Sequence, residues 1–304
     1  MIPTISGKVG LLQNMDSLEA QYRGSTQHRQ KVGELARDFG GWRRCRGDGS
    51  CFYRACGFSL IEALLHRRPK DLRPVLERVR ADAAGAASGL LEFATPLCDL
   101  SPTEALELWY HRILTDPRLD ADVVRAMRMV SASFLTRNRE ADFNGLPLHV
   151  YVEASHGLSL EAFRDHEVLP DGVEAESVAL MLAPLAFDLK FEIIQLDSSD
   201  SAAQRYMVPE GPGEALATLL FKPGHYDIIY RKDTALALLA FQDRWDLEKR
   251  CTRTPTCPIC MQDTDAAPLA CGCIYCEDCL KSYRGSGAVT CAVCHMQFFD
   301  MAEC

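Results

Sequence analysis

Apolar residues recur at spacings of three and four along much of the N-terminal half of the chain, which is the period of an amphipathic helix. The segment from Cys51 to Leu65 shows this pattern with apolar residues on nearly every turn. Further helices are predicted over residues 12–38, 71–88, 102–115, 119–136 and 174–187. Pro184 must kink or end the last of these helices.

The pattern changes after this helical region. Residues 191–196, 218–221 and 226–230 are rich in β-branched and aromatic side chains, which predicts short strands, and Pro223-Gly224 predicts a turn between the last two. Residues 197–213 are rich in Ser, Asp, Gly and Pro, so we expect a surface loop there. Helices early and a small sheet late predict an α+β domain that ends near residue 232.

One more helix is predicted over residues 234–250, with Asp233 as its N-cap and Leu238, Phe241 and Trp245 on one face. It leads into a region of different composition, because residues 251–304 hold ten of the 14 cysteines. We therefore divide the chain into a domain over residues 1–232, a linker helix over 233–250 and a cysteine-rich module over 251–304.

Composition and charge narrow the classes of protein. A length of 304 residues predicts about two domains, and 47% hydrophobic with 25% charged residues is typical of a globular protein. The net charge of −9 and the lack of a Lys/Arg block argue against a nucleic-acid partner. No stretch reaches the roughly 18 apolar residues of a membrane helix, and the N-terminus lacks the pattern of a secretory signal. We expect no membrane contact and a location inside a cell, in the cytoplasm or the nucleus.

Cys51 is a candidate nucleophile because it opens a predicted helix. Unpaired backbone N–H groups and the positive end of the helix dipole then face its sulfur and favour the thiolate. Gly47 and Gly49, just ahead of it, allow the backbone to turn tightly and to aim N–H groups at the oxygen of an attacked carbonyl. Residues 48–50 are therefore a candidate oxyanion loop, in which Gly49 and Ser50 directly precede the thiol.

His225 is the candidate general base, at the start of a predicted strand. Side chains two residues apart project from the same face of a strand, so Asp227 can orient the His225 ring. The order Cys, His, Asp fits a thiol hydrolase that needs no cofactor for catalysis. Each signal alone is also compatible with a core cysteine after a turn and with a structural histidine in a strand.

The C-terminal cysteines have the spacing of metal ligands. In a reducing compartment their density indicates metal rather than disulfides. Short Cys-x2-Cys turns place two sulfurs about 2.3 Å from one ion, and eight thiols make two tetrahedral zinc sites. A module of about 50 residues then depends on zinc to fold. The pairs are Cys257 and Cys260, Cys271 and Cys273, Cys276 and Cys279, and Cys291 and Cys294.

Two stretches, RGDGSCFYRACGFSLIEALL and FKPGHYDIIY, resemble the nucleophile region and the histidine strand of the ovarian-tumour (OTU) cysteine proteases of the otubain branch. The resemblance covers about residues 12–232. It implies a papain-like fold that hydrolyses the isopeptide bond between the ubiquitin C-terminus and a lysine. By this match Cys51 is the nucleophile, His225 the base and Asp227 its orienter, and the Asp48 loop helps to build the oxyanion hole. Ser50 stands where the family usually has Asn, and we expect it to act mainly through its backbone.

The cysteine array resembles a RING finger, in which the first and third pairs share one zinc and the second and fourth share the other. This implies two zinc ions, one held by Cys257, Cys260, Cys276 and Cys279 and one by Cys271, Cys273, Cys291 and Cys294. Ile259 matches the apolar position through which RING fingers contact a ubiquitin-conjugating enzyme, and Leu280 nearby is a second candidate contact. Tyr283, Ala292 and His295 depart from the residues usual in the family, so we expect docking of that enzyme rather than stimulated transfer.

Together these features predict a deubiquitinating cysteine peptidase whose RING recruits a ubiquitin-conjugating enzyme or a substrate, with ubiquitin or ubiquitin chains as partners. One alternative is a RING ligase or adaptor whose OTU domain binds ubiquitin without cleaving it. Another is a peptidase for a ubiquitin-like modifier. A third is a RING that serves only as a zinc-stapled partner module, because fold does not fix function.

Overall fold

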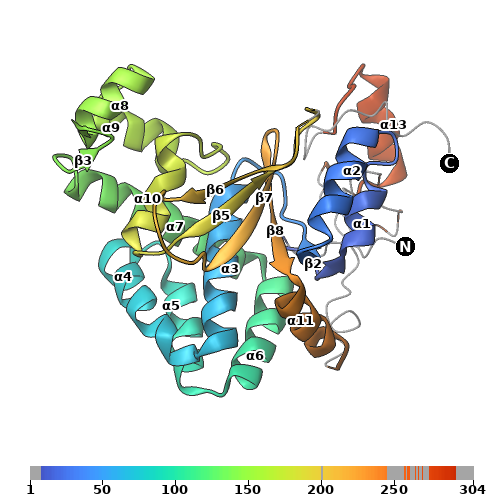
Figure 1. The fold of residues 1–304 in the computed structure, drawn as a ribbon, viewed down its shortest axis with the longest axis horizontal. Coiled ribbons are helices and arrows are strands. Elements are labelled where there is room, and N and C mark those ends of the chain that lie inside the picture. The colour runs from blue at the N-terminus through green and yellow to red at the C-terminus, as the bar shows by residue number, and fades with distance from the viewer. Residues whose placement is uncertain are drawn as a thin grey trace.

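The fold is built around one mixed sheet of six strands (Figure 1). The computed structural model of the protein describes residues 8–199, 201–244, 257, 259–260, 264, 266, 269 and 274–291. The strand order in the sheet is β1-β2-β8-β7-β5-β6, with β5 and β7 parallel and the other neighbours antiparallel. The strands are β1 (Gln13–Asn14), β2 (Phe39–Arg43), β5 (Phe191–Gln195), β6 (Gln204–Val208), β7 (Ala217–Lys222) and β8 (His225–Arg231). A separate hairpin is formed by β3 (Asp142–Phe143) and β4 (Leu146–Pro147).

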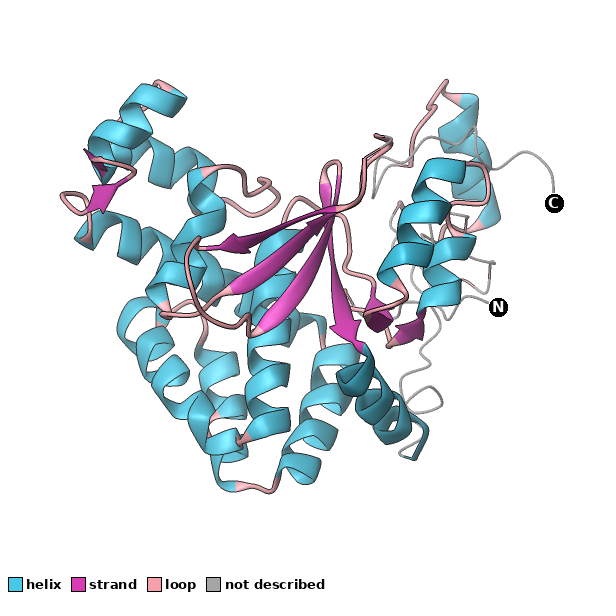
Figure 2. Ribbon diagram, in the orientation of Figure 1, coloured by secondary structure: helices cyan, strands magenta, loops and turns pink. Residues whose placement is uncertain are grey.

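Helices cover both faces of the sheet. In Figure 2 the larger group lies below and to the left of the strands, whereas α1 and α2 lie to the right. The helices are α1 (Met15–Ala20), α2 (Thr26–Leu35), α3 (Cys51–Arg67), α4 (Arg73–Ala83), α5 (Ser88–Ala94), α6 (Pro102–Thr115), α7 (Pro117–Arg137), α8 (Leu148–His156), α9 (Leu160–Phe163), α10 (Val178–Ala186), α11 (Lys232–Arg244) and α13 (Glu277–Gly285). Single turns of 3-10 or π helix are η1 (Pro69–Leu72), η2 (Pro96–Asp99) and η3 (Arg164–Val168).

Alternation along the strands produces two apolar cores. Side chains of successive strand residues point to opposite faces, so Ile193 and Ile194 of β5 enter different cores. Ile228 and Ile229 of β8 divide in the same way. The larger core contains α3, in which every residue from Cys51 to Glu62 is buried. This part of the helix is buried on all sides because the sheet, α6 and α7 surround it.

The structure confirms the predicted α+β class and the strands on both sides of the Pro223-Gly224 turn. The single helix predicted over residues 12–38 is wrong. The segment forms β1, α1 and α2, with Ser25 capping the second helix. Gly40-Gly41 does not end a helix but lies within β2, where pairing with β8 overrides the helical pattern.

Other predicted elements also differ in the structure. The helix predicted over residues 71–88 forms η1 and then α4, which ends at Ala83. The last helix of the N-terminal region begins at Val178 rather than at residue 174, after a residue with positive φ, Ser177. Residues 197–213 contain the edge strand β6, which the sequence analysis missed because tertiary pairing with β5 creates it. Asp233 lies in the first turn of α11 and is not its N-cap, and Trp245 lies outside the described residues. No helix in the described part of the chain is long and apolar enough to cross a membrane.

Candidate active site

The candidate site forms where the start of α3 meets the start of β8. Cys51 is the first residue of α3 and its side chain is buried. The backbone N–H of Tyr226 in β8 donates to Cys51 Sγ over 3.4 Å, although 175 positions separate the two residues in the sequence. The packing of α3 against β8 therefore brings the predicted nucleophile to the strand that carries the predicted base.

His225 is held by Asp227, as the strand alternation predicts. His225 Nε2 lies 2.8 Å from Asp227 Oδ1, and the same oxygen accepts a 2.8 Å hydrogen bond from the backbone N–H of Cys45. Because Nε2 is engaged, Nδ1 is the ring nitrogen left to face Cys51. The second oxygen of Asp227 lies 2.6 Å from Lys222 Nζ. The fully buried Asp227 carboxylate is thus bound on both oxygens.

Charges around this pair set its protonation. Burial lowers the pKa of His225, but the Asp227 charge and the hydrogen bonds with Asp227 and Cys51 outweigh burial and raise that pKa to about 9. Burial raises the pKa of Asp227, whereas the charges of Lys222 and His225 hold it well below its usual range. The pair is therefore an imidazolium and a carboxylate at neutral pH, which suits a group that gives a proton to the leaving amine.

The loop before Cys51 is tightly constrained. Gly49 has a φ of +72°, and a Cβ at this position would lie 1.9 Å from the carbonyl oxygen of Gly172. The Asp48 carboxylate faces the protein rather than the thiol, because it accepts from the backbone N–H of Ser50 at 3.2 Å and binds Arg54 with both oxygens. Burial raises the pKa of Asp48, but hydrogen bonds from Arg54 lower it below its usual value. Asp48 therefore shapes the loop through its side chain.

Three charged residues that position the candidate catalytic groups were not predicted from the sequence. Lys222 pairs with Asp227, Arg54 binds both Asp48 and Asp120, and Arg128 contacts Gly49 and Ser50. Arg54 carries a signal in the sequence, because it is a charged residue in the largely apolar stretch over residues 51–61, and Arg128 carries a weaker one, because Met127 and Met129 flank it. Lys222 has a weaker signal, its place beside the turn that precedes His225.

Four of the predicted zinc ligands lie together. The sulfurs of Cys257, Cys260, Cys276 and Cys279 all lie within 4.8 Å of one another, and those of Cys260 and Cys276 are 3.7 Å apart. A tetrahedron with zinc–sulfur bonds of about 2.3 Å has edges of about 3.8 Å, so the cluster fits this ion. Burial raises the pKa of Cys257, but backbone N–H groups of Cys260, Cys276 and Ile259 outweigh burial and lower it to about 6. The hydrogen bond with Cys276 raises the pKa of Cys279 to about 12, so Cys257 ionises more readily than Cys279. This grouping of the first and third cysteine pairs is the one that the RING resemblance implies.

The second predicted zinc site falls mainly outside the described residues. Cys291 is buried and its sulfur lies 3.1 Å from the Tyr275 hydroxyl, while Cys271, Cys273 and Cys294 are not among the described residues. The two candidate contacts for a conjugating enzyme differ in exposure. Ile259 is 43% exposed, whereas Leu280 packs beside the buried Tyr275 and is partly covered.

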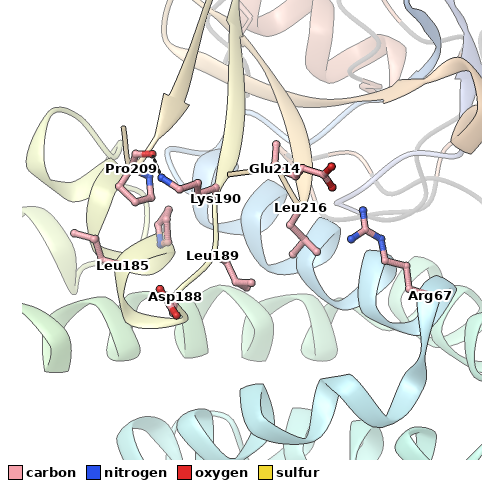
Figure 3. Close-up of a pocket in the computed structure, with 10 residues that line it drawn as sticks. Arg67, Leu185, Asp188, Leu189, Lys190, Pro209, Glu214 and Leu216 are labelled. Atoms are coloured by element: carbon pink, nitrogen blue, oxygen red, sulfur yellow. Dashed lines mark hydrogen bonds between the residues drawn. The ribbon is translucent and has the colours of Figure 1, made fainter. Parts of the chain in front are cut away.

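A separate cavity of about 350 Å³ lies at the opposite end of α3 (Figure 3). The helix is 17 residues long, which places this cavity roughly 25 Å from its N-terminus. Lys190 in its wall donates to the carbonyl oxygens of Pro209 and Glu210, at 3.1 and 3.0 Å. None of the residues predicted to carry out catalysis lines it.

A thiol at the start of a central helix and an aspartate-paired histidine on the adjoining strand place the chain among the cysteine peptidases. Residues 3–231 match the model of the family described as peptidase C65 otubain, and the chain belongs to that family. Residues 257–292 match a RING-type zinc finger. Both resemblances read from the sequence are therefore confirmed.

The matches to curated relatives extend over most of the length of each relative. Human ubiquitin thioesterase OTUB2 is 26% identical over 215 residues, which is 68% of this chain and 88% of the relative. The OTU-domain-containing deubiquitinating enzyme 1 of Arabidopsis thaliana is 27% identical over 256 residues, 74% of this chain and 81% of the relative.

Solved structures confirm the fold. A complex of ceOTUB1 with ubiquitin aldehyde and UBC13~Ub has a TM-score of 0.62 at 24% identity, covering 75% of this chain and 94% of that one. A complex of h/ceOTUB1 with ubiquitin aldehyde and UBCH5B~Ub has a TM-score of 0.57 at 25% identity, covering 75% of this chain and 91% of that one.

Proposed function

We propose that this protein is a deubiquitinating cysteine peptidase that hydrolyses isopeptide bonds at the ubiquitin C-terminus. The observation that carries the proposal is the contact of Cys51 Sγ with the start of β8, where His225 is fixed by Asp227. Its otubain relatives are named ubiquitin thioesterases, which supports ubiquitin as the substrate.

The geometry supports the following sequence of steps. Cys51 attacks the glycyl carbonyl carbon as a thiolate, and the electron pair of the carbonyl moves onto oxygen. His225 then gives its Nδ1 proton to the lysine amine as the carbon–nitrogen bond breaks, leaving a thioester. A water gives a proton to His225 while its oxygen attacks the thioester, and the thiolate leaves with the imidazolium restored. Asp227 keeps the ring oriented through both steps.

The oxyanion is bound by the loop before α3. The N–H of Ser50 is taken by Asp48 Oδ1, so Ser50 is not a free donor. We assign the oxyanion donors to the backbone N–H groups of Cys51 and of the Asp48-Gly49 turn. With these donors, Asp48 shapes the loop and does not contact the substrate.

A ubiquitin probe with a C-terminal electrophile tests this proposal. Incubation with the full chain should add the mass of one ubiquitin, and Cys51→Ala should abolish the adduct. Parallel probes built on ubiquitin-like modifiers decide which modifier is preferred. A folded, zinc-loaded sample that forms no adduct with any of them would overturn the peptidase assignment and favour the ligase or adaptor reading.

We also propose that the RING binds a ubiquitin-conjugating enzyme through Ile259, which is 43% exposed and lies beside the cysteine cluster. A structure of an otubain relative includes UBCH5B~Ub, which supports this class of partner for the otubain domain, and the match to a RING-type zinc finger supports it for the C-terminal module. Ile259→Ala should weaken binding of conjugating enzymes in calorimetry, whereas Val289→Ala, a matched control on the same module at 51% exposure, should not. Equal binding by wild type and Ile259→Ala would contradict the assignment. Discharge of ubiquitin from the charged enzyme to free lysine would show ligase activity.

A further inference from the structure

Arg128 lies in the middle of α7 and is almost completely buried, at 1% exposure. Its Nη2 donates to the carbonyl oxygen of Gly49 at 3.3 Å, to Ser50 Oγ at 3.0 Å and to the carbonyl oxygen of Val173 at 2.8 Å. Its Nη1 donates to the carbonyl oxygen of Val168 at 2.9 Å. One guanidinium therefore ties the loop before Cys51 to the segment over residues 168–173.

The Ser50 side chain completes this tie. Its hydroxyl oxygen also accepts a 3.2 Å hydrogen bond from the backbone N–H of Gly172. Gly172 is the residue whose carbonyl oxygen packs against Gly49. In addition to the backbone role expected from the sequence, the Ser50 side chain is the point where Arg128 and Gly172 meet.

The charge of Arg128 is poorly neutralised. Its one ion pair within the described part of the chain is with Asp171 Oδ1, at 3.8 Å, and the Asp171 side chain is 72% exposed. Arg54, the other buried arginine at this loop, instead contacts the carboxylates of Asp48 and Asp120 at 2.7 and 2.9 Å. A buried cation bound mainly by neutral oxygens is costly, and its positive potential acts on any negative charge that develops nearby.

We propose that Arg128 is a positioning residue for the oxyanion loop. It holds Gly49 and Ser50 in the conformation that aims backbone N–H groups at the substrate carbonyl, and its charge stabilises the oxyanion that forms there. This inference rests on the proposed peptidase function and goes beyond it, because it assigns Arg128 a role through the loop and through its charge, without contact with the substrate. Such loops must be held to within about 0.5 Å to be effective.

The test separates the oxyanion from the thiolate. Arg128→Met removes the charge and the hydrogen bonds, and Arg128→Lys keeps the charge without the planar fork. Hydrolysis of a ubiquitin C-terminal fluorogenic amide gives kcat and KM. Alkylation of Cys51 by iodoacetamide, followed by peptide mass spectrometry, reports the thiolate alone because displacement of iodide forms no oxyanion. Arg137→Met is the matched control, since Arg137 lies on the same helix, is 46% exposed and pairs with Asp82 instead.

We expect Arg128→Met to lower kcat by about 10²-fold, in the range for loss of one oxyanion donor, with KM and the Cys51 alkylation rate within about threefold of wild type. Arg128→Lys should lie between the two, and Arg137→Met should match wild type. A folded Arg128→Met with unchanged kcat would overturn the inference. So would a fall in alkylation equal to the fall in kcat, since Arg128 would then act on the thiol.

If Arg128→Met is destabilised, the variants Ser50→Ala and Arg128→Lys test the inference. Ser50→Ala removes the hydroxyl that Arg128 contacts, and it should lower kcat more than KM while the melting temperature stays close to that of wild type. If Ser50→Ala and Arg128→Lys both keep full kcat, the inference is wrong. Failure of the proposed function is distinguishable, because wild type itself would then hydrolyse nothing.

Discussion

Replacing Gly49 by alanine should disable hydrolysis, and the structure gives the size of the perturbation. Gly49 has a φ of +72°, a region that costs an alanine roughly 1–2 kcal/mol. The new Cβ would also lie 1.9 Å from the carbonyl oxygen and 2.4 Å from the carbonyl carbon of Gly172, where real contacts do not fall below 3.0 Å. Both atoms are backbone, so the two loops must separate by about 1 Å.

A displacement of about 1 Å at a site that positions reacting groups costs about 10²-fold in rate, or about 2.7 kcal/mol of transition-state stabilisation. We therefore expect Gly49→Ala to lower kcat/KM for a ubiquitin C-terminal fluorogenic amide by about 10²-fold and to lower the melting temperature. Gly157→Ala is the matched control, because Gly157 has a φ of +67° with no atom within 4 Å of its Cβ position. It should lose about 1 kcal/mol of stability and no activity.

Two results would refute this reasoning. Gly49→Ala with kcat/KM within twofold of wild type would mean that the contact with Gly172 does not fix the loop. An equal loss of activity in Gly157→Ala would mean that the effect comes from general destabilisation. The difference in melting temperature between the two variants isolates the overlap with Gly172 from the backbone strain that they share.

Three further predictions follow from the charges and the metal ligands. His225 has a pKa of about 9 against its usual 6.5, so its protonation stabilises the fold fully below pH 6.5, and this contribution is lost as the pH rises to about 9. In a pH–rate profile, kcat/KM should fall over the same upper range of pH. Asp227→Asn should shift this fall to lower pH. Lys222→Met leaves the buried Asp227 carboxylate without its cation and should cost about 3 kcal/mol in urea unfolding, while Lys222→Arg should retain most of the stability; equal stability of both would contradict the ion pair. A chelator should release zinc, measured by an absorbing indicator dye, and make the C-terminal module sensitive to protease. Amide hydrolysis should persist, because the four clustered thiols lie outside the otubain match. Loss of hydrolysis on chelation would contradict this independence of the two domains.

Local chemistry made much of the site predictable. Cys51 at a helix start, the Asp227 side chain two residues from His225, and short Cys-x2-Cys turns all depend on neighbours in the sequence, and periodicity of two or three to four residues reveals them. The predicted helix from Cys51 and the Pro223-Gly224 hairpin are found for the same reason. The errors fall where pairing between distant segments overrides local preference, as in β2 and β6.

The residues able to carry thiol chemistry and those able to bind zinc can be recognised along the chain, because both properties follow from residue type and short-range spacing. The groups that hold these residues in place come from tertiary contacts. The contact of Cys51 with β8 and the hydrogen bond from Arg128 to Ser50 join residues that lie 175 and 78 positions apart along the chain. Such contacts arise from packing of the sheet against its helices, and no periodic pattern within one segment encodes the partner across that interface.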